Sequence, residues 1–265
     1  MNITQINDNI YRLTIPYKDV FTTVYTIRTP EGVALFDAAS YDTDAEEYII
    51  PFLQTVGVTA EELKYVFVSH NHGDHAGGLK GFLPFYPDVT VVSRSPKICD
   101  RMDSESHRVI VPQEGDILLG ELQVVTIPGH TVDSAALLDL RDHTMITGDC
   151  LQVHGVVGFQ DWASNIRLPA EYLAALEKVR KLPVEQLVTA HDYYPNGYRA
   201  EGREAVLNMI DNCEKPMRRL QKLILDNPEM DDLQIRELYN DNPNAPTIRE
   251  GVVRAMRTAI SDGKI

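Results

Sequence analysis

The feature that most constrains the fold is a cluster of four potential metal ligands immediately after a short apolar stretch. Residues 65–68 (YVFV) have the composition of a buried strand and run directly into 69–78 (SHNHGDHAGG). This segment places three histidines and an aspartate within six residues. Because such side chains would diverge onto two faces of a regular strand, we expect a turn, with Gly73, Gly77 and Gly78 supplying the tight backbone.

Three further candidate ligands lie downstream, each at the end of a short apolar strand: His130 in PGHT, Asp149 in TGD and His191 in TAH. A lone histidine is more often a hydrogen-bonding group, and a lone aspartate a turn former. Five of the eight histidines, however, share this strand-end context. Imidazoles and carboxylates suit zinc, iron or manganese, so the residue types do not select the metal. The predicted ligands are His70, His72, Asp74, His75, His130, Asp149 and His191.

The remaining sequence predicts a mixed α/β fold. The first forty residues alternate polar and apolar positions, as in an antiparallel meander. Later segments alternate between helical and strand patterns, and everything after Arg199 reads as helix broken near Pro228 and Pro243. We expect a catalytic domain over residues 1–200. Residues 201–265 would be a C-terminal helical extension, either an appendage or packed as part of the same domain.

Composition and charge indicate which cellular compartment and which classes of partner to expect. The chain of 265 residues is 43% apolar, enough for a substantial core. It lacks an N-terminal signal pattern and any apolar run of the roughly 18 residues needed to span a membrane. We therefore expect a cytoplasmic protein with reduced cysteines. The net charge of −14 disfavours nucleic acid as a partner and favours a small-molecule substrate. Homo-oligomerisation stays open.

The series H-x-H-x-D-H, PGHT, TGD and a final strand-end histidine resembles the metallo-β-lactamase superfamily, in order and spacing, over approximately residues 5–200. The resemblance implies a four-layer αββα sandwich, here with extra C-terminal helices. It also implies that His70, His72 and His130 bind a first metal ion. Asp74, His75 and His191 would bind a second, and Asp149 would bridge the two.

A binuclear site of this kind is able to support a hydrolytic activity. Two divalent ions about 3.5–4 Å apart can share a water and lower its pKa toward about 7, which provides a hydroxide at neutral pH. Asp74 is the candidate catalytic residue, because it could also accept the proton of the nucleophile. We expect a hydrolase for a small-molecule thioester, ester, lactone or phosphoester, with two zinc ions, or iron or manganese in their place.

Comparison with subfamilies of this superfamily reduces the number of substrate classes that we expect. Flavodiiron proteins have a carboxylate at the position of His72, and acyl-homoserine lactonases have a tyrosine at that of Gln152. Class B β-lactamases with two zincs lack a counterpart of His75 and the aspartate bridge. Glyoxalase II shares the histidine pattern, the bridge and a helical extension. The alternatives are an iron-dependent redox enzyme, an endoribonuclease-like phosphodiesterase and a non-catalytic metal-binding domain.

Loops that follow the ligand-bearing strands hold four candidate substrate contacts. His154 could donate a hydrogen bond to a developing oxyanion. Trp162 and Arg167 suit an acidic or amphipathic substrate, although ordinary packing and a surface charge are the more common explanation for such a pair. Tyr194 could orient a substrate carbonyl.

Overall fold

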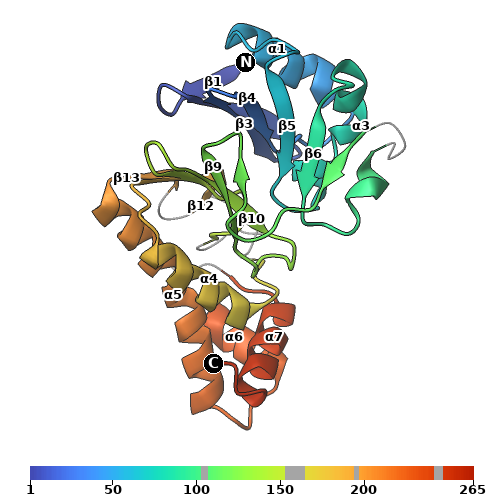
Figure 1. Ribbon diagram of the computed structural model, residues 1–265. Coiled ribbons are helices and arrows are strands. Elements are labelled where there is room, and N and C mark those ends of the chain that lie inside the picture. Colours follow the sequence, from blue (N-terminus) through green and yellow to red (C-terminus); the bar gives the residue numbers. More distant parts are fainter. Residues whose placement is uncertain (103–106, 153–164, 194–196, 242–246) are drawn as a thin grey trace. The chain divides into compact units, whose positions relative to one another are not determined.

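The computed structural model describes residues 1–102, 107–152, 165–193, 197–241 and 247–265 (Figure 1). It contains two β-sheets accompanied by helices, so the predicted mixed α/β class is confirmed. The chain forms two compact units, Met1–Val125 and Thr126–Ile265. The division predicted from the sequence, at residue 200, stays a prediction. Among the described residues, no helix combines the length and the apolar character that crossing a bilayer requires.

The first sheet has seven strands that follow one another in chain order. Its first four strands pair antiparallel, as predicted, and the last three join in parallel. Parallel strands end at the same edge of a sheet, so the residues after β4 and β5 are brought together. The strands are β1 (Asn2–Gln5), β2 (Ile10–Tyr17), β3 (Val20–Thr29), β4 (Gly32–Phe36), β5 (Leu63–Val68), β6 (Thr90–Ser93) and β7 (Val109–Ile110).

Short helices cover one face of this sheet. Strand residues such as Leu35 and Val66 share a fully buried cluster with Phe52 and Phe82 from the helices. Each such side chain contributes about 1.5–3 kcal/mol through burial, so the cluster fixes the sheet edge on which the candidate ligands lie. The helices are η1 (Ala45–Ile49), α1 (Ile50–Thr55), α2 (Gly73–Ala76), α3 (Leu79–Phe82), η2 (Leu83–Phe85) and η3 (Ile98–Arg101).

The second sheet has six strands in the order β13-β12-β11-β10-β9-β8. Strands β11 and β12 pair in parallel, and the crossover between them contains α4 (Pro169–Lys181), which begins at Pro169 as predicted. The prediction of helix directly after Arg199 is wrong. Residues 197–201 form a strand because they pair antiparallel with β12, and the helix starts only after Gly202. The strands are β8 (Ile117–Leu118), β9 (Leu122–Thr126), β10 (Ala135–Asp139), β11 (Thr144–Ile146), β12 (Gln186–Tyr193) and β13 (Gly197–Glu201).

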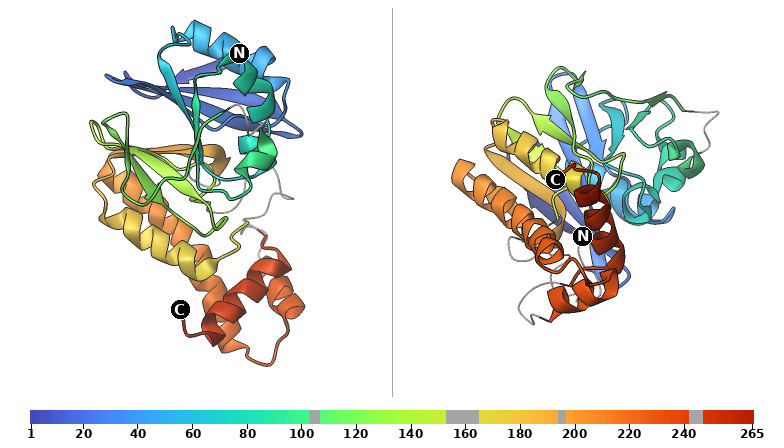
Figure 2. Two further views of the ribbon diagram at one scale, coloured as in Figure 1. Left: turned by 45° about the vertical axis from the view of Figure 1, so that its right-hand side comes forward. Right: turned by 90° about the horizontal axis from the view of Figure 1, so that it is seen from below.

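Three helices complete the second unit: α5 (Arg203–Asp226), α6 (Asp232–Asn240) and α7 (Glu250–Ser261). The predicted break near Pro228 is confirmed, and α6 restarts on a capping box formed by Asp231 and Gln234. Helix α7 contacts both α4 and α5. Figure 2 shows that the second half of α5, with α6 and α7, extends past the sheet of its unit.

Candidate metal centre

The first ligand cluster, His70, His72, Asp74 and His75, lies in the first unit at the end of β5. The sequence predicts a turn here, but the structure has an extended segment followed by helix α2, in which Ala76 N–H donates to the carbonyl of His72. The helix, rather than a turn, brings Asp74 and His75 back toward the preceding histidines.

Gly77 and Gly78 lie in a turn between α2 and α3, and close packing explains why both are glycine. A Cβ atom on Gly77 would lie 2.0 Å from the carbonyl oxygen of Ser40, and one on Gly78 would lie 2.2 Å from that of Ala38. Both glycines have ordinary right-handed helical backbone angles. A Cβ on Gly73, by contrast, would meet nothing within 4 Å. Gly77 and Gly78 are therefore required for α2 to approach the loop after β4, whereas Gly73 is not.

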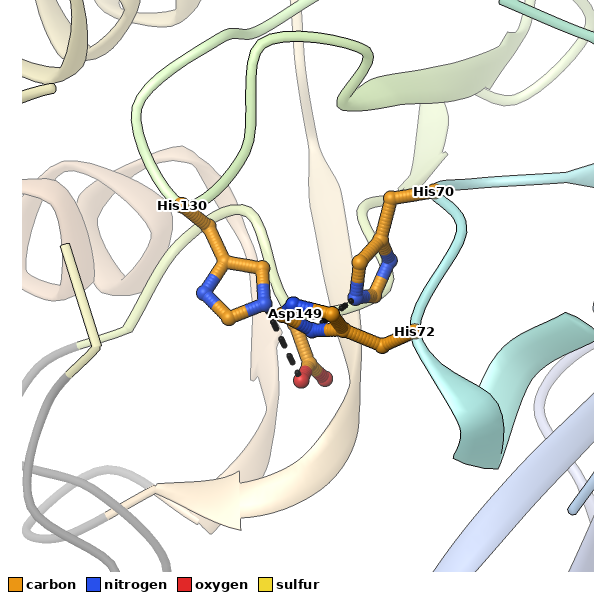
Figure 3. A group of neighbouring side chains, drawn as sticks. All are labelled: His70, His72, His130 and Asp149. Atoms are coloured by element: carbon orange, nitrogen blue, oxygen red, sulfur yellow. Dashed lines mark hydrogen bonds and ion pairs between the residues drawn. The ribbon is translucent and has the colours of Figure 1, made fainter. Parts of the chain in front are cut away.

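Donor atoms of the first cluster face one another. Nε2 of His70 lies 2.9 Å from Nδ1 of His72, as Figure 3 shows. Nε2 of His75 lies 3.6 Å from Oδ2 of Asp74. All four residues except the partly exposed His72 are buried.

A buried carboxylate that the sequence analysis missed orients two of these histidines. Asp37 Oδ2 lies 2.7 Å from Nδ1 of His75 and accepts a hydrogen bond from the hydroxyl of Ser69 at 3.0 Å. The Ser69 hydroxyl oxygen also lies 3.0 Å from Nδ1 of His70. With both Nδ1 atoms engaged, His70 and His75 present Nε2 for a metal, in the manner of carboxylate–histidine–metal triads. Burial raises the pKa of Asp37, against the opposing influence of His75.

Asp37 follows β4 directly, in the same strand-end position as the predicted ligands, and this was the signal that could have found it. Its backbone is in the left-handed region, with φ +64°, and Ala39 has φ +59°. Such angles are uncommon for residues other than glycine and cost free energy, which the surrounding hydrogen bonds offset. Among those bonds, Ala38 N–H donates to the carbonyl of His75 at 2.7 Å.

The second ligand cluster, His130, Asp149 and His191, lies in the second unit and comes from three separate strand ends. Oδ2 of Asp149 is 3.7 Å from Nε2 of His130 (Figure 3), and Oδ1 is 3.3 Å from Nε2 of His191. All three side chains are buried. Each carboxylate oxygen thus faces a different imidazole, which is the arrangement that a bridging carboxylate needs.

His130 is held by groups on the segment that leads into α4. Its Nδ1 donates to the carbonyl oxygen of Asn165 at 2.8 Å and lies 3.0 Å from the amide nitrogen of Gln152. Gln152 in turn accepts from Asn165 N–H at 2.9 Å, so the three residues form one network. The carbonyl of Gly129 accepts from Arg167 N–H at 2.8 Å. Nε2 of His130 is consequently left for metal binding.

The separations between donor atoms fit divalent ions. Two ligands about 2.0–2.1 Å from a tetrahedral ion lie about 3.4 Å apart. The four separations within the clusters, 2.9, 3.3, 3.6 and 3.7 Å, bracket this value. The two longest exceed ordinary hydrogen-bond distances, so direct hydrogen bonding does not explain them. The donors are nitrogen and oxygen atoms without thiolate, a set that suits zinc, iron or manganese.

Of the four predicted substrate contacts, the structure describes only one. Arg167 is exposed and lines a cavity of the second unit. His154, Trp162 and Tyr194 lie outside the described residues. Tyr193 is buried, and its ring centroid is 5.9 Å from that of His191.

Residues 17–191, which include all seven candidate ligands and extend into both units, match the sequence profile of the Metallo-beta-lactamase superfamily. The chain belongs to this superfamily. Its fold is also that of a metallo-beta-lactamase family protein from Thermus thermophilus, with a TM-score of 0.66, 17% identity and coverage of 98% of this chain and 95% of that one. The predicted metallo-β-lactamase fold, with two sheets, accompanying helices and additional C-terminal helices, is thereby confirmed.

Two further comparisons show how broad the superfamily is. A hydroxyacylglutathione hydrolase from Francisella tularensis subsp. holarctica is 28% identical over 146 residues, which are 54% of this chain and 55% of the relative. This chain thus aligns with about half the length of that enzyme. The flavodiiron protein from Giardia intestinalis shares the fold with a TM-score of 0.64 and 18% identity, over 81% of this chain and 60% of that one.

Proposed function

We propose that this superfamily member is a binuclear metal-dependent hydrolase of a small-molecule thioester, ester, lactone or phosphoester. The observation that carries the proposal is the placement of the Asp149 carboxylate, whose two oxygens lie 3.7 and 3.3 Å from Nε2 of His130 and His191. A carboxylate in that position is suited to bridging two ions.

The proposal assigns one ion to each of two ligand groups that share Asp149. One group is His70, His72, His130 and Asp149, and the other is Asp74, His75, Asp149 and His191. Each group contains nitrogen and oxygen donors, and each draws on both ligand clusters. The superfamily match over residues 17–191 supports this joint assignment, because it includes every one of these residues.

When bound, two such ions supply a hydroxide nucleophile near neutral pH and polarise the oxygen of the bond to be cleaved. The residues of the chain hold and orient the reacting groups. Asp37 and Ser69 orient the imidazoles of His75 and His70, and the carbonyl of Asn165 orients that of His130. The Thr22 hydroxyl donates to the backbone carbonyl of Asp74, which steadies the residue proposed to hold and release a proton at its carboxylate.

Among the four substrate classes, we favour thioesters. The relative that is 28% identical over 146 residues is named a hydroxyacylglutathione hydrolase, and an acyl group on the glutathione sulfur is a thioester. The net charge of −14 supports a small molecule over a nucleic acid. Zinc is the metal proposed for this chemistry, since it needs no redox change.

An iron-dependent redox enzyme is the second candidate, and the shared fold with a flavodiiron protein is the observation that favours it. His72 weighs against it, because flavodiiron proteins resemble this chain elsewhere but have a carboxylate at that position. Elemental analysis of protein purified without added metal separates the two candidates. Zinc or manganese supports the hydrolase, whereas a stoichiometric content of iron together with redox turnover and no hydrolysis supports the alternative.

The proposed activity is tested with a panel of thioester, ester, lactone and phosphodiester substrates on zinc-loaded protein. We expect turnover of at least one class and its loss on chelation. Asp74→Asn should lower kcat by about a hundredfold or more, because it removes both a ligand and a proton carrier. Asp226→Asn, an exposed carboxylate change on α5, is the matched control and should retain full activity. Turnover that persists in metal-free protein, or no turnover of any class, would refute the proposal.

A further inference from the structure

A cavity of about 340 Å³ lies in the second unit, where the start of α4 meets α7. The walls combine apolar and charged groups. Leu168, Pro169 and Ala255 provide apolar surface, and Arg167, Arg254 and Lys264 bring three cationic side chains to the same cavity. Its volume falls within the range of small-molecule sites, about 300–1,000 Å³.

The charge of this lining is opposite to that of the whole chain. Three cations face a single lining carboxylate, Glu171, in a protein whose net charge is −14. Arg254 is paired with Glu250 at 2.6 Å and with Asp232 at 3.4 Å, and Lys264 with Asp262 at 3.2 Å, but none of these acidic partners lines the cavity.

Arg167 differs from the other two cations. Its side chain is exposed, and within the described part of the chain we find no acidic partner for it. Its guanidinium offers five N–H donors in a planar fork that matches a carboxylate or a phosphate. As far as the described residues go, the cavity therefore has a guanidinium without an acidic partner beside an apolar wall.

Hydrogen bonds connect the segment that lines the cavity to the loop that carries His130. Arg167 N–H and Leu168 N–H both donate to the carbonyl of Gly129, at 2.8 and 2.9 Å. The carbonyl of Asn165, two residues before Arg167, accepts from Nδ1 of His130. A molecule held in the cavity thus contacts the same segment that orients a candidate metal ligand.

We propose that this cavity binds the anionic end of the substrate, a carboxylate or phosphate carried on a short apolar body. The proposal rests on the proposed hydrolase function and narrows its substrates to acidic molecules. Arg167 is the principal anion contact, Arg254 and Lys264 add to the positive potential, and Pro169 and Ala255 contact the apolar body.

The test is direct binding of hexanoate to the full-length protein, with hexanamide as the uncharged probe of the same shape, measured by NMR or calorimetry. Arg167→Gln should weaken hexanoate binding about tenfold or more, since a charge-assisted hydrogen bond is lost. Gly251→Phe provides a second test that leaves every charge in place. Gly251 lines the cavity, and a Cβ atom there meets nothing within 4 Å, so the ring can enter the cavity without backbone clash.

Arg218→Gln on α5 is the matched control, because it removes one exposed, paired arginine that does not line the cavity. We expect hexanoate to bind the wild-type protein and this control equally. Both cavity variants should bind it weakly, and hexanamide should bind weakly throughout. Equal binding of the two probes, or unchanged hexanoate binding in Gly251→Phe and Arg167→Gln, would overturn the proposal.

An additional variant separates this proposal from the proposed function. Asp149→Asn is expected to abolish hydrolysis while leaving hexanoate binding intact, because Asp149 does not line the cavity. Loss of hexanoate binding in Asp149→Asn, with binding retained in Gly251→Phe, would place the anion on the metal centre and contradict the cavity site. Absence of hydrolysis in the wild-type protein would refute the hydrolase but not the anion site.

Discussion

The two ligand clusters present similar donor atoms but are built in different ways. In the first, four ligands come from six consecutive residues, and side chains, Asp37 and Ser69, orient two of the imidazoles. In the second, three strand ends each contribute one ligand, and a backbone carbonyl, that of Asn165, orients His130. A contiguous cluster can be strongly affected by a change in one supporting side chain. A dispersed cluster that relies on backbone acceptors should tolerate such changes better.

The largest expected effect concerns the packing on which the first cluster depends. Gly77→Ala should reduce the free energy of unfolding by about 3 kcal/mol or more, because the new Cβ would lie 2.0 Å from the carbonyl oxygen of Ser40. Gly73→Ala is the control in the same helix and should be neutral or slightly stabilising, since nothing lies within 4 Å of its Cβ. Urea unfolding followed by circular dichroism measures both. Equal stability of the two variants would show that α2 can shift away from the loop after β4.

A smaller effect is expected from the groups that orient the histidines. Asp37→Asn should weaken zinc binding about 10- to 100-fold, because an amide has only one acceptor oxygen, whereas Oδ1 of Asp37 accepts from Ser69 N–H and Oδ2 lies against His75 Nδ1. Gln152→Ala should weaken it less than about tenfold, because the carbonyl of Asn165 still accepts from His130. Competition with a chromophoric chelator gives both affinities. If Gln152→Ala proves the more damaging change, the contrast drawn between the two clusters is wrong.

The smallest effect is expected from alkylation of the cysteine thiols, which differ in exposure between the two units. Cys99 in the first unit is exposed, whereas Cys150 and Cys213 in the second are buried. Burial raises the pKa of Cys213 to about 12, so this thiol stays protonated. Iodoacetamide should label Cys99 alone in the folded protein, without loss of bound metal, as mass spectrometry can determine. Labelling of Cys213 at a rate similar to Cys99 would indicate that the second unit opens readily.

The ease of predicting each cluster from the sequence follows the same contrast. The candidate ligands of the first cluster were predicted from their contiguity and those of the second from their strand-end positions, and the structure groups the donor atoms of these residues. Their role as metal ligands stays a prediction. The role of Asp37 was not predicted, because it depends on the parallel pairing of β4 with β5. This pairing brings together residues 32 positions apart in the sequence. The role of the Asn165 carbonyl could not be predicted, because every residue has a backbone carbonyl and the residue type does not indicate which one accepts a hydrogen bond.

Two details of the predicted fold depend on tertiary contacts. Residues 200 and 201 were predicted as the start of a helix, but pairing with β12 makes them the end of strand β13. Gly77 and Gly78 lie in a turn, as predicted, but contacts with residues 38–40 are what require glycine there. In the first case the tertiary contact overrides the local pattern. The roles of His154, Trp162 and Tyr194 stay predictions.

The most direct test of the central claim, that Asp149 bridges two ions bound by the two clusters together, is metal stoichiometry after zinc loading and gel filtration. We predict about two ions per chain in the wild-type protein, about one in Asp74→Asn and fewer than one in Asp149→Asn, since only Asp149 belongs to both ligand groups. A single ion in the wild-type protein, or two ions retained by Asp149→Asn, would contradict it.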